Sequence, residues 1–166
     1  MAKWNVNASD LISKHLTQYA DKALDAFEEG VIDGASDIIE SSPIGINVNG
    51  TETGVYRGNW QIGRQVNNRV FTTANKNKGR SYAEGKIKGR LKKGGRLFLF
   101  NNSPYASVIE FGGYPDPVKK GTYIRGRGYV KRSSGGYSKQ APGGHVRTGI
   151  RFMRIRIKQN LKKVKL

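Results

Sequence analysis

Between residues 8 and 41, apolar side chains recur at every third or fourth position, which is the spacing of one face of an α-helix. The stripe consists of Ile12, Leu16, Tyr19, Ala23, Phe27, Val31, Ala35 and Ile38. Asn7 or Ser9 can cap the start. Pro43 favours an end nearby, because the residue before a proline avoids the helical conformation. We therefore predict one long N-terminal helix, which two internal glycines could interrupt.

Charge is divided unevenly along the chain. The sequence has 30 Lys and Arg against 12 Asp and Glu, a net charge of +18. Residues 1–40 carry eight acids and three bases, which leaves 27 bases and four acids, a net of +23, for the remainder. This excess favours a polyanion or an acidic protein surface as a partner. The acids of the predicted helix indicate either a solvated face or an acidic docking surface.

Composition excludes several classes of protein. The 166 residues suit a single domain spanning 1–166. The absence of cysteine excludes disulfides, thiol catalysis and cysteine metal sites. No run of 18 apolar residues predicts a membrane span. The first residues lack the apolar core of a signal peptide, so we expect synthesis in the cytoplasm and no membrane partner.

Strand-like patterns follow the helix. Residues 55–73 alternate in polarity, with Tyr56, Trp60 and Ile62 followed by Val66 and Val70. Residues 96–100 are apolar after the first position, which predicts a short central strand.

Two further helices are predicted. Ser103 and Pro104 suit the start of a short helix that ends at the pair of glycines 112–113. Residues 146–164 repeat apolar side chains at helical spacing between basic residues, which predicts a basic C-terminal helix.

Two long segments rich in glycine and basic residues separate these elements, at 75–95 and 113–141. We predict both as extended loops that contact DNA or an acidic partner, or are simply solvated. The second segment also interleaves tyrosines with bases, a composition suited to stacking and phosphate contact. The candidate contact residues are Lys86, Lys88, Arg90, Lys92, Lys93, Arg125 and Arg127.

Catalytic patterns are poor. The two histidines, His15 and His145, have no second histidine or carboxylate at ligand spacing, so we expect no metal. The acids beyond residue 40 are scattered, and no glycine-rich phosphate loop is present. We expect neither an enzyme nor a cofactor.

Three segments in order carry a resemblance to a known family. They are Thr-Gly-Val-Tyr-Arg-Gly-Asn-Trp at 53–60, Asn-Asn-Ser-Pro-Tyr-Ala at 101–106 continuing to Gly112, and Gln-Ala-Pro-Gly-Gly-His-Val-Arg at 140–147. With a preceding helix, they resemble the neck, or tail-completion, family of tailed bacteriophages. The motif positions here are Gly54, Arg57, Trp60, Tyr105, Glu110, Phe111, Gly112, Pro142 and Arg147.

This resemblance implies an α+β fold, with a long N-terminal helix and shorter helices packed on a small, mostly antiparallel sheet. It also implies a structural protein of the head–tail junction, made in the host cytoplasm and built into the virion as a ring of six copies. Its partners would be other copies, other neck, connector or tail-tube proteins, and genomic double-stranded DNA. A tail terminator that caps the tail tube, and a basic nucleic-acid-binding protein, are the alternatives.

Physical reasoning gives the motif residues scaffold roles. We expect Trp60 to fill the core between sheet and helix. Glycines 54, 58 and 112 should hold backbone that a side chain would block. Tyr105 and Phe111 should pack rather than bind a ligand. Glu110 lies among apolar neighbours, so its expected partner is a base, either Arg57 or Arg147. The pair could lie within one subunit or across a ring interface. We also expect all three motifs to meet in the core.

Overall fold

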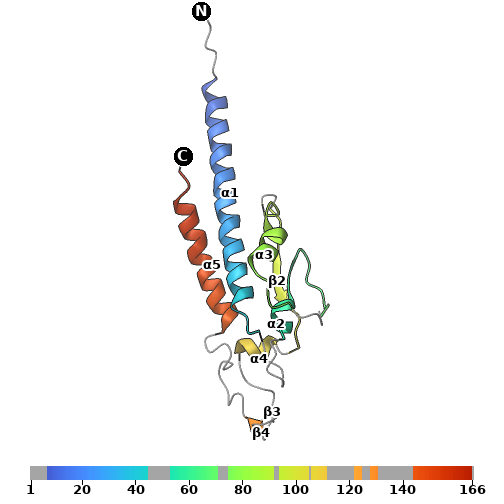
Figure 1. Cartoon of the computed structure of the whole chain (residues 1–166). Coiled ribbons are helices and arrows are strands. Elements are labelled where there is room, and N and C mark those ends of the chain that lie inside the picture. The colour runs from blue at the N-terminus through green and yellow to red at the C-terminus, as the bar shows by residue number, and fades with distance from the viewer. Residues whose placement is uncertain are drawn as a thin grey trace, which may run out of the picture.

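The computed structural model describes residues 7–44, 53–70, 75–91, 94–104, 106–111, 122–124, 128–130 and 144–165. Within these ranges, five helices and four short strands follow one another in the order α1, α2, β1, α3, β2, α4, β3, β4, α5. Figure 1 shows α1 as a long rod, with α5 along one side of its C-terminal half and the small β1–β2 sheet with α3 on the other side. The predicted α+β class is confirmed in this form.

Helix α1 (Ala8–Glu40) runs without interruption for 33 residues. Asn7 caps it, because its side chain accepts a hydrogen bond from the backbone N–H of Ser9 (3.2 Å). The helix ends at Glu40, and its C-cap residue Ser41 lies two residues before the proline. Both predicted ends are therefore confirmed.

Glycines inside α1 allow close contact with α5 (His145–Lys162) instead of breaking the helix. A β-carbon at Gly30 would lie 2.7 Å from Ile157, and one at Gly34 would lie 2.2 Å from Met153. On α5, Gly149 makes the same kind of contact, since a β-carbon there would overlap the side chain of Ile38 of α1. The two helices therefore run antiparallel at short distance, as small residues permit.

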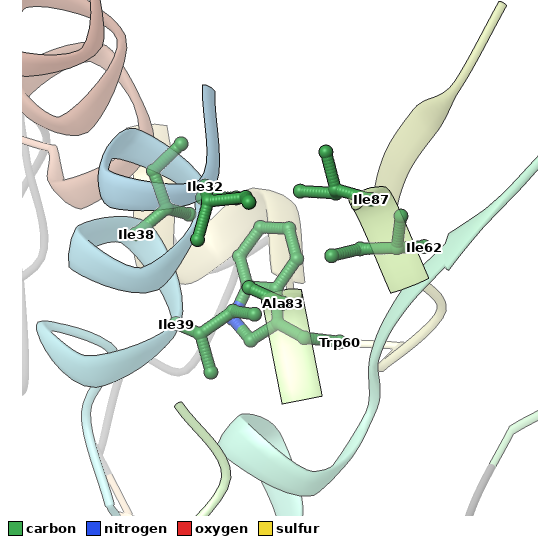
Figure 2. Packing of buried hydrophobic residues seen from close by; sticks show 8 residues of the cluster. Ile32, Ile38, Ile39, Trp60, Ile62, Ala83 and Ile87 are labelled. Carbon is green, nitrogen blue, oxygen red and sulfur yellow. The ribbon is translucent and has the colours of Figure 1, made fainter. Parts of the chain in front are cut away.

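The main core lies between α1, the sheet and α3. Strands β1 (Trp60–Gly63) and β2 (Phe98–Asn101) pair antiparallel, with Trp60 opposite Asn101 and Ile62 opposite Leu99. Figure 2 shows the isoleucines of α1 and β1 around the indole of Trp60, together with Ala83 and Ile87. Trp60 is 4 % exposed, so its predicted place in the core between sheet and helix is confirmed.

Helix α3 (Arg80–Ile87) corrects the prediction of one extended loop over 75–95. Ala83 and Ile87, four residues apart, are both buried against the core. The buried carboxylate of Glu28 accepts hydrogen bonds from the backbone N–H groups of Gly89 (2.7 Å) and Leu91 (3.1 Å). An acid of α1 thus replaces the partners that these loop amides would otherwise find in water.

Basic residues of this segment also bind the rest of the chain. The guanidinium of Arg80 forms ion pairs with Glu29 and Asp33 of α1. Lys78 donates to the carbonyls of Gly58 (2.9 Å) and Trp60 (2.6 Å), and burial lowers its pKa. Over the C-terminal half of α1, the acidic face therefore binds the 75–91 segment of the same chain.

Three other expectations about strands need correction. Residues 55–58 form the short helix α2 (Val55–Gly58), and residues 64–70 have no regular structure. Strand β2 has one strand partner in the part of the chain that the structure describes, so it is not central. The expected end of the strand at 71–73 lies outside the described residues.

The second predicted loop contains a pair of strands. Strands β3 (Thr122–Ile124) and β4 (Gly128–Val130) pair antiparallel, with Tyr123 opposite Tyr129. Arg125, Arg127 and the rest of 113–141 lie outside the described residues. Helix α4 (Ala106–Phe111) and helix α5 agree with the two remaining predicted helices.

Candidate functional site

The first motif segment enters the site through a left-handed residue. Gly54 has φ +59°, and a β-carbon there would lie 2.7 Å from the backbone nitrogen of Lys76. Only glycine fits this backbone without strain, so the prediction for Gly54 is confirmed. Gly58 is buried at the end of α2. The short helix α2 then presents Tyr56, which is 4 % exposed, towards the N-terminus of α5.

Tyr56, Trp60 and His145 form a cluster of three rings. The ring centroids lie 6.2 Å apart for Tyr56 and Trp60, 5.5 Å for Tyr56 and His145, and 5.8 Å for Trp60 and His145. All three pairs meet edge to face, which is a favourable geometry for aromatic rings. The cluster joins the first motif segment to the third.

Three further hydrogen bonds hold this cluster in place. The indole N–H of Trp60 donates to the hydroxyl of Ser42 (2.6 Å), which in turn donates to the carbonyl of Ile38 (2.8 Å). The side-chain amide of Asn101, from β2, donates to the carbonyl of Tyr56 (2.9 Å). The second motif segment therefore contacts the first at its opening residue.

Glu110 of α4 caps α5. Its carboxylate accepts hydrogen bonds from the backbone N–H groups of Val146 (3.0 Å) and Arg147 (3.2 Å). Helix α5 has no acid in its first turn and no side-chain cap of its own at Gly144. The negative charge thus lies where the helix dipole and two free amides favour it.

The expectation that Glu110 pairs with a base is confirmed in part. The guanidinium of Arg147 lies 3.8 Å from its carboxylate, and Nδ1 of His145 lies 3.4 Å away. Arg57 was the wrong alternative. Its guanidinium instead donates to the carbonyls of Glu40, Ser42 and Lys76, and so ties α2 to the end of α1.

His145 is the buried centre of the site, at 6 % exposure. Its Nε2 lies 3.2 Å from the hydroxyl of Tyr56, while its Nδ1 faces Glu110 and has no hydrogen bond within normal limits. Burial lowers the pKa of His145, and the nearby Glu110 carboxylate opposes this in part. Burial therefore favours the neutral form of this imidazole, which lies between a phenol and a carboxylate.

Phe111 does not pack as predicted, because its ring is 58 % exposed. The guanidinium of Arg147 lies 5.0 Å from the centre of this ring, within the range of a cation–π contact. Both residues border an open, largely apolar groove of about 550 Å³ between β2, α4 and α5, with Trp60 and Met153 among its lining residues. Tyr105, Gly112 and Pro142 lie outside the described residues.

The structure thus brings Trp60, Glu110 and Arg147 together around His145, where α2, β1 and α4 meet the N-terminus of α5; we call this region the joint. Gly54 and Arg57 lie at its edge. It leaves Lys86, Lys88 and Arg90 on α3 and the turn after it, away from the joint. Lys92 and Lys93 lie outside the described residues. His145 and Tyr56 were not singled out as site residues, although both belong to the motif segments.

Within the described ranges, no group of three or more histidine and carboxylate side chains could hold a metal ion. None of the helices there is long and apolar enough to cross a membrane. Comparison with protein-family models, curated proteins and solved structures finds no match.

Proposed function

We propose that the chain is a structural virion protein of the head–tail junction of a tailed bacteriophage. Copies of it would form a ring that joins or completes the tail and surrounds the path of the DNA. The proposed location in the virion is inferred from the sequence resemblance. The joint supports that resemblance, because residues of all three motif segments contact one another there.

One observation carries the assembly part of the proposal. The stripe of apolar side chains that α5 covers between Gly30 and Ile38 continues towards the N-terminus of α1 as Phe27, Leu16 and Ile12. Ile12 and Leu16 are each 59 % exposed. A helix with one apolar face is stabilised by burying that face, so the uncovered stretch favours contact with another chain.

A neighbouring copy is the occupant that we propose. The stripe at the N-terminal half of α1 and the groove beside α5 are different apolar surfaces of one molecule. A contact between two different surfaces of identical chains is head-to-tail, and such contacts close into rings when the rotation between copies allows it. The function would then depend on shape and charge, without chemistry on a substrate.

Oligomer mass tests this proposal. The purified chain should give a ring mass, with six copies expected, by light scattering and negative-stain imaging at moderate salt, because salt screens the +18 charge of each copy. The variant Leu16→Glu should stay helical but lose the ring. Gln18→Glu is the matched control, since it adds the same charge at an exposed position about 160° away around the helix.

A second measurement places the protein in the particle. Antibody labelling of virions should mark the head–tail junction, and labelling of separate, unjoined tails as well would favour a tail terminator. A chain that remains monomeric at moderate salt, with or without virion lysate, would contradict the ring.

A further inference from the structure

The basic residues of α5 form a line on one face of the helix. They occur at steps of four, three, four and four positions: Arg147, Arg151, Arg154, Lys158 and Lys162. At 3.6 residues per turn, these steps keep all five on one side, over a length of about 22 Å. We call this set the α5 basic ridge.

The ridge faces away from α1. Gly149, Met153 and Ile157 are the residues of α5 that meet α1. The ridge is centred about 140° around the helix from them. All five of its residues are exposed. In Figure 1, α5 lies at the outer side of the pair of helices.

Helix α5 itself supplies no acid that could neutralise the ridge. Helix α5 contains no Asp or Glu between His145 and Lys162. Within the described ranges, the ridge meets a carboxylate at its first residue, where Glu110 lies 3.8 Å from Arg147. By contrast, the 75–91 segment has its bases partly neutralised, with Arg80 paired to two acids and Lys88 paired to Glu84 (3.0 Å).

We propose that the α5 basic ridge binds the phosphate backbone of double-stranded DNA. Three of the five residues are arginines, whose planar guanidinium suits phosphate oxygens. Five bases spaced along one face of a helix match the repeating charges of a phosphate backbone. This inference rests on the proposed function in one respect: in a ring, the ridge would face the DNA path.

Salt-dependent binding to a duplex tests the inference directly. Wild-type protein would be titrated onto a 30-base-pair duplex at 50–200 mM salt, with anisotropy as the readout. The ridge variant carries Arg151→Gln, Arg154→Gln and Lys158→Gln. The control carries Lys86→Gln, Lys88→Gln and Arg90→Gln, which removes the same formal charge from the 75–91 segment. Circular dichroism would check that both variants keep the wild-type helix content.

The ridge variant should lower the slope of log K against log salt by about three units, since each lost phosphate contact removes about 0.9. The control should keep the wild-type slope. Equal loss in both variants would overturn the inference, because binding would then follow total charge rather than one surface. Binding of wild type to polyglutamate but not to duplex would also overturn it, in favour of an acidic protein partner.

The two proposals can fail separately, because the mass of each sample is measured as well. A ring that does not bind duplex would overturn the ridge inference alone. A monomer that binds duplex through the ridge would overturn the ring alone.

Discussion

Gly34 of α1 lies against Met153 of α5 so closely that a β-carbon at position 34 would be 2.2 Å from that of Met153. No side chain other than hydrogen fits there unless the helices separate. Gly30 makes the same kind of contact with Ile157 one turn away. The contact between α1 and α5 is therefore set by two glycines, which intrinsic helix propensity would disfavour in a helix interior.

Gly34→Val should destabilise the fold by about 1–3 kcal/mol, because the new side chain overpacks the contact between helices. Urea unfolding followed by circular dichroism measures the change. The control is Gly85→Ala in α3, where a β-carbon would meet nothing within 4 Å. It should leave stability unchanged or raise it by up to about 1 kcal/mol. Equal stability of Gly34→Val and wild type would contradict the close contact.

Glu110→Ala should cost about 1–3 kcal/mol, because it leaves the backbone N–H groups of Val146 and Arg147 without their acceptor. Glu110→Gln should cost less, since its amide oxygen can still accept one of these bonds. Thermal unfolding would rank the two variants. Glu84→Gln removes the same charge from a partly exposed residue whose pair with Lys88 lies at the surface, so it should show no measurable change. A loss as large as that of Glu110→Ala would show that charge alone, not capping, matters.

His145 predicts a dependence of stability on pH. Burial lowers its pKa in the folded state below the ordinary value of 6.5, so the unfolded chain binds the proton more readily. The free energy of unfolding should therefore decrease as the pH falls below about 6.5, and level off once the folded imidazole is also protonated. His145→Gln removes this titration. Urea unfolding between pH 5 and 8 should show a shallower slope for the variant, and parallel slopes would refute the assignment.

Trp60→Ala should cost about 3–5 kcal/mol, because the indole is buried in the core and its N–H is bonded to Ser42. The variant should be insoluble or rapidly proteolysed. Phe152→Ala removes a half-exposed ring of α5 and should stay within about 0.5 kcal/mol of wild type. A soluble, folded Trp60→Ala protein that fails to join virions would make Trp60 an interface residue instead.

Long periodic patterns predicted the helices well. The stripe of α1 and the spacing of α5 extend over many turns, so single exceptions do not mislead. Prediction from the local sequence failed where tertiary contacts determine the secondary structure. Residues 55–58 alternate like a strand, yet the left-handed Gly54 starts a helical turn there. The side chain of Asn101, from the distant strand β2, donates to the carbonyl of Tyr56 within this turn.

The site was predicted in outline. A base was expected beside Glu110, and Arg147 lies there, but the main partners of the carboxylate are backbone amides, which no side-chain pattern reveals. The order in the 75–91 segment was missed for the same reason. Two of its backbone N–H groups donate to the carboxylate of Glu28, which is 61 residues away from Gly89. The four-residue spacing of Ala83 and Ile87 is the sequence signal that could have predicted α3.

In the part of the chain that the structure describes, α1 is anchored through its C-terminal half, so its N-terminal half acts as a lever arm. From Gly34 to Ala8 the rod extends about 39 Å, at 1.5 Å per residue. A change of about 5° in the crossing of α1 and α5 would move the tip by about 3 Å, close to half a helical turn. Small changes of volume at Gly30 or Gly34 would thus be magnified at the far end, where neighbouring copies would have to fit. The two glycines therefore set the angular tolerance of any assembly built through this rod.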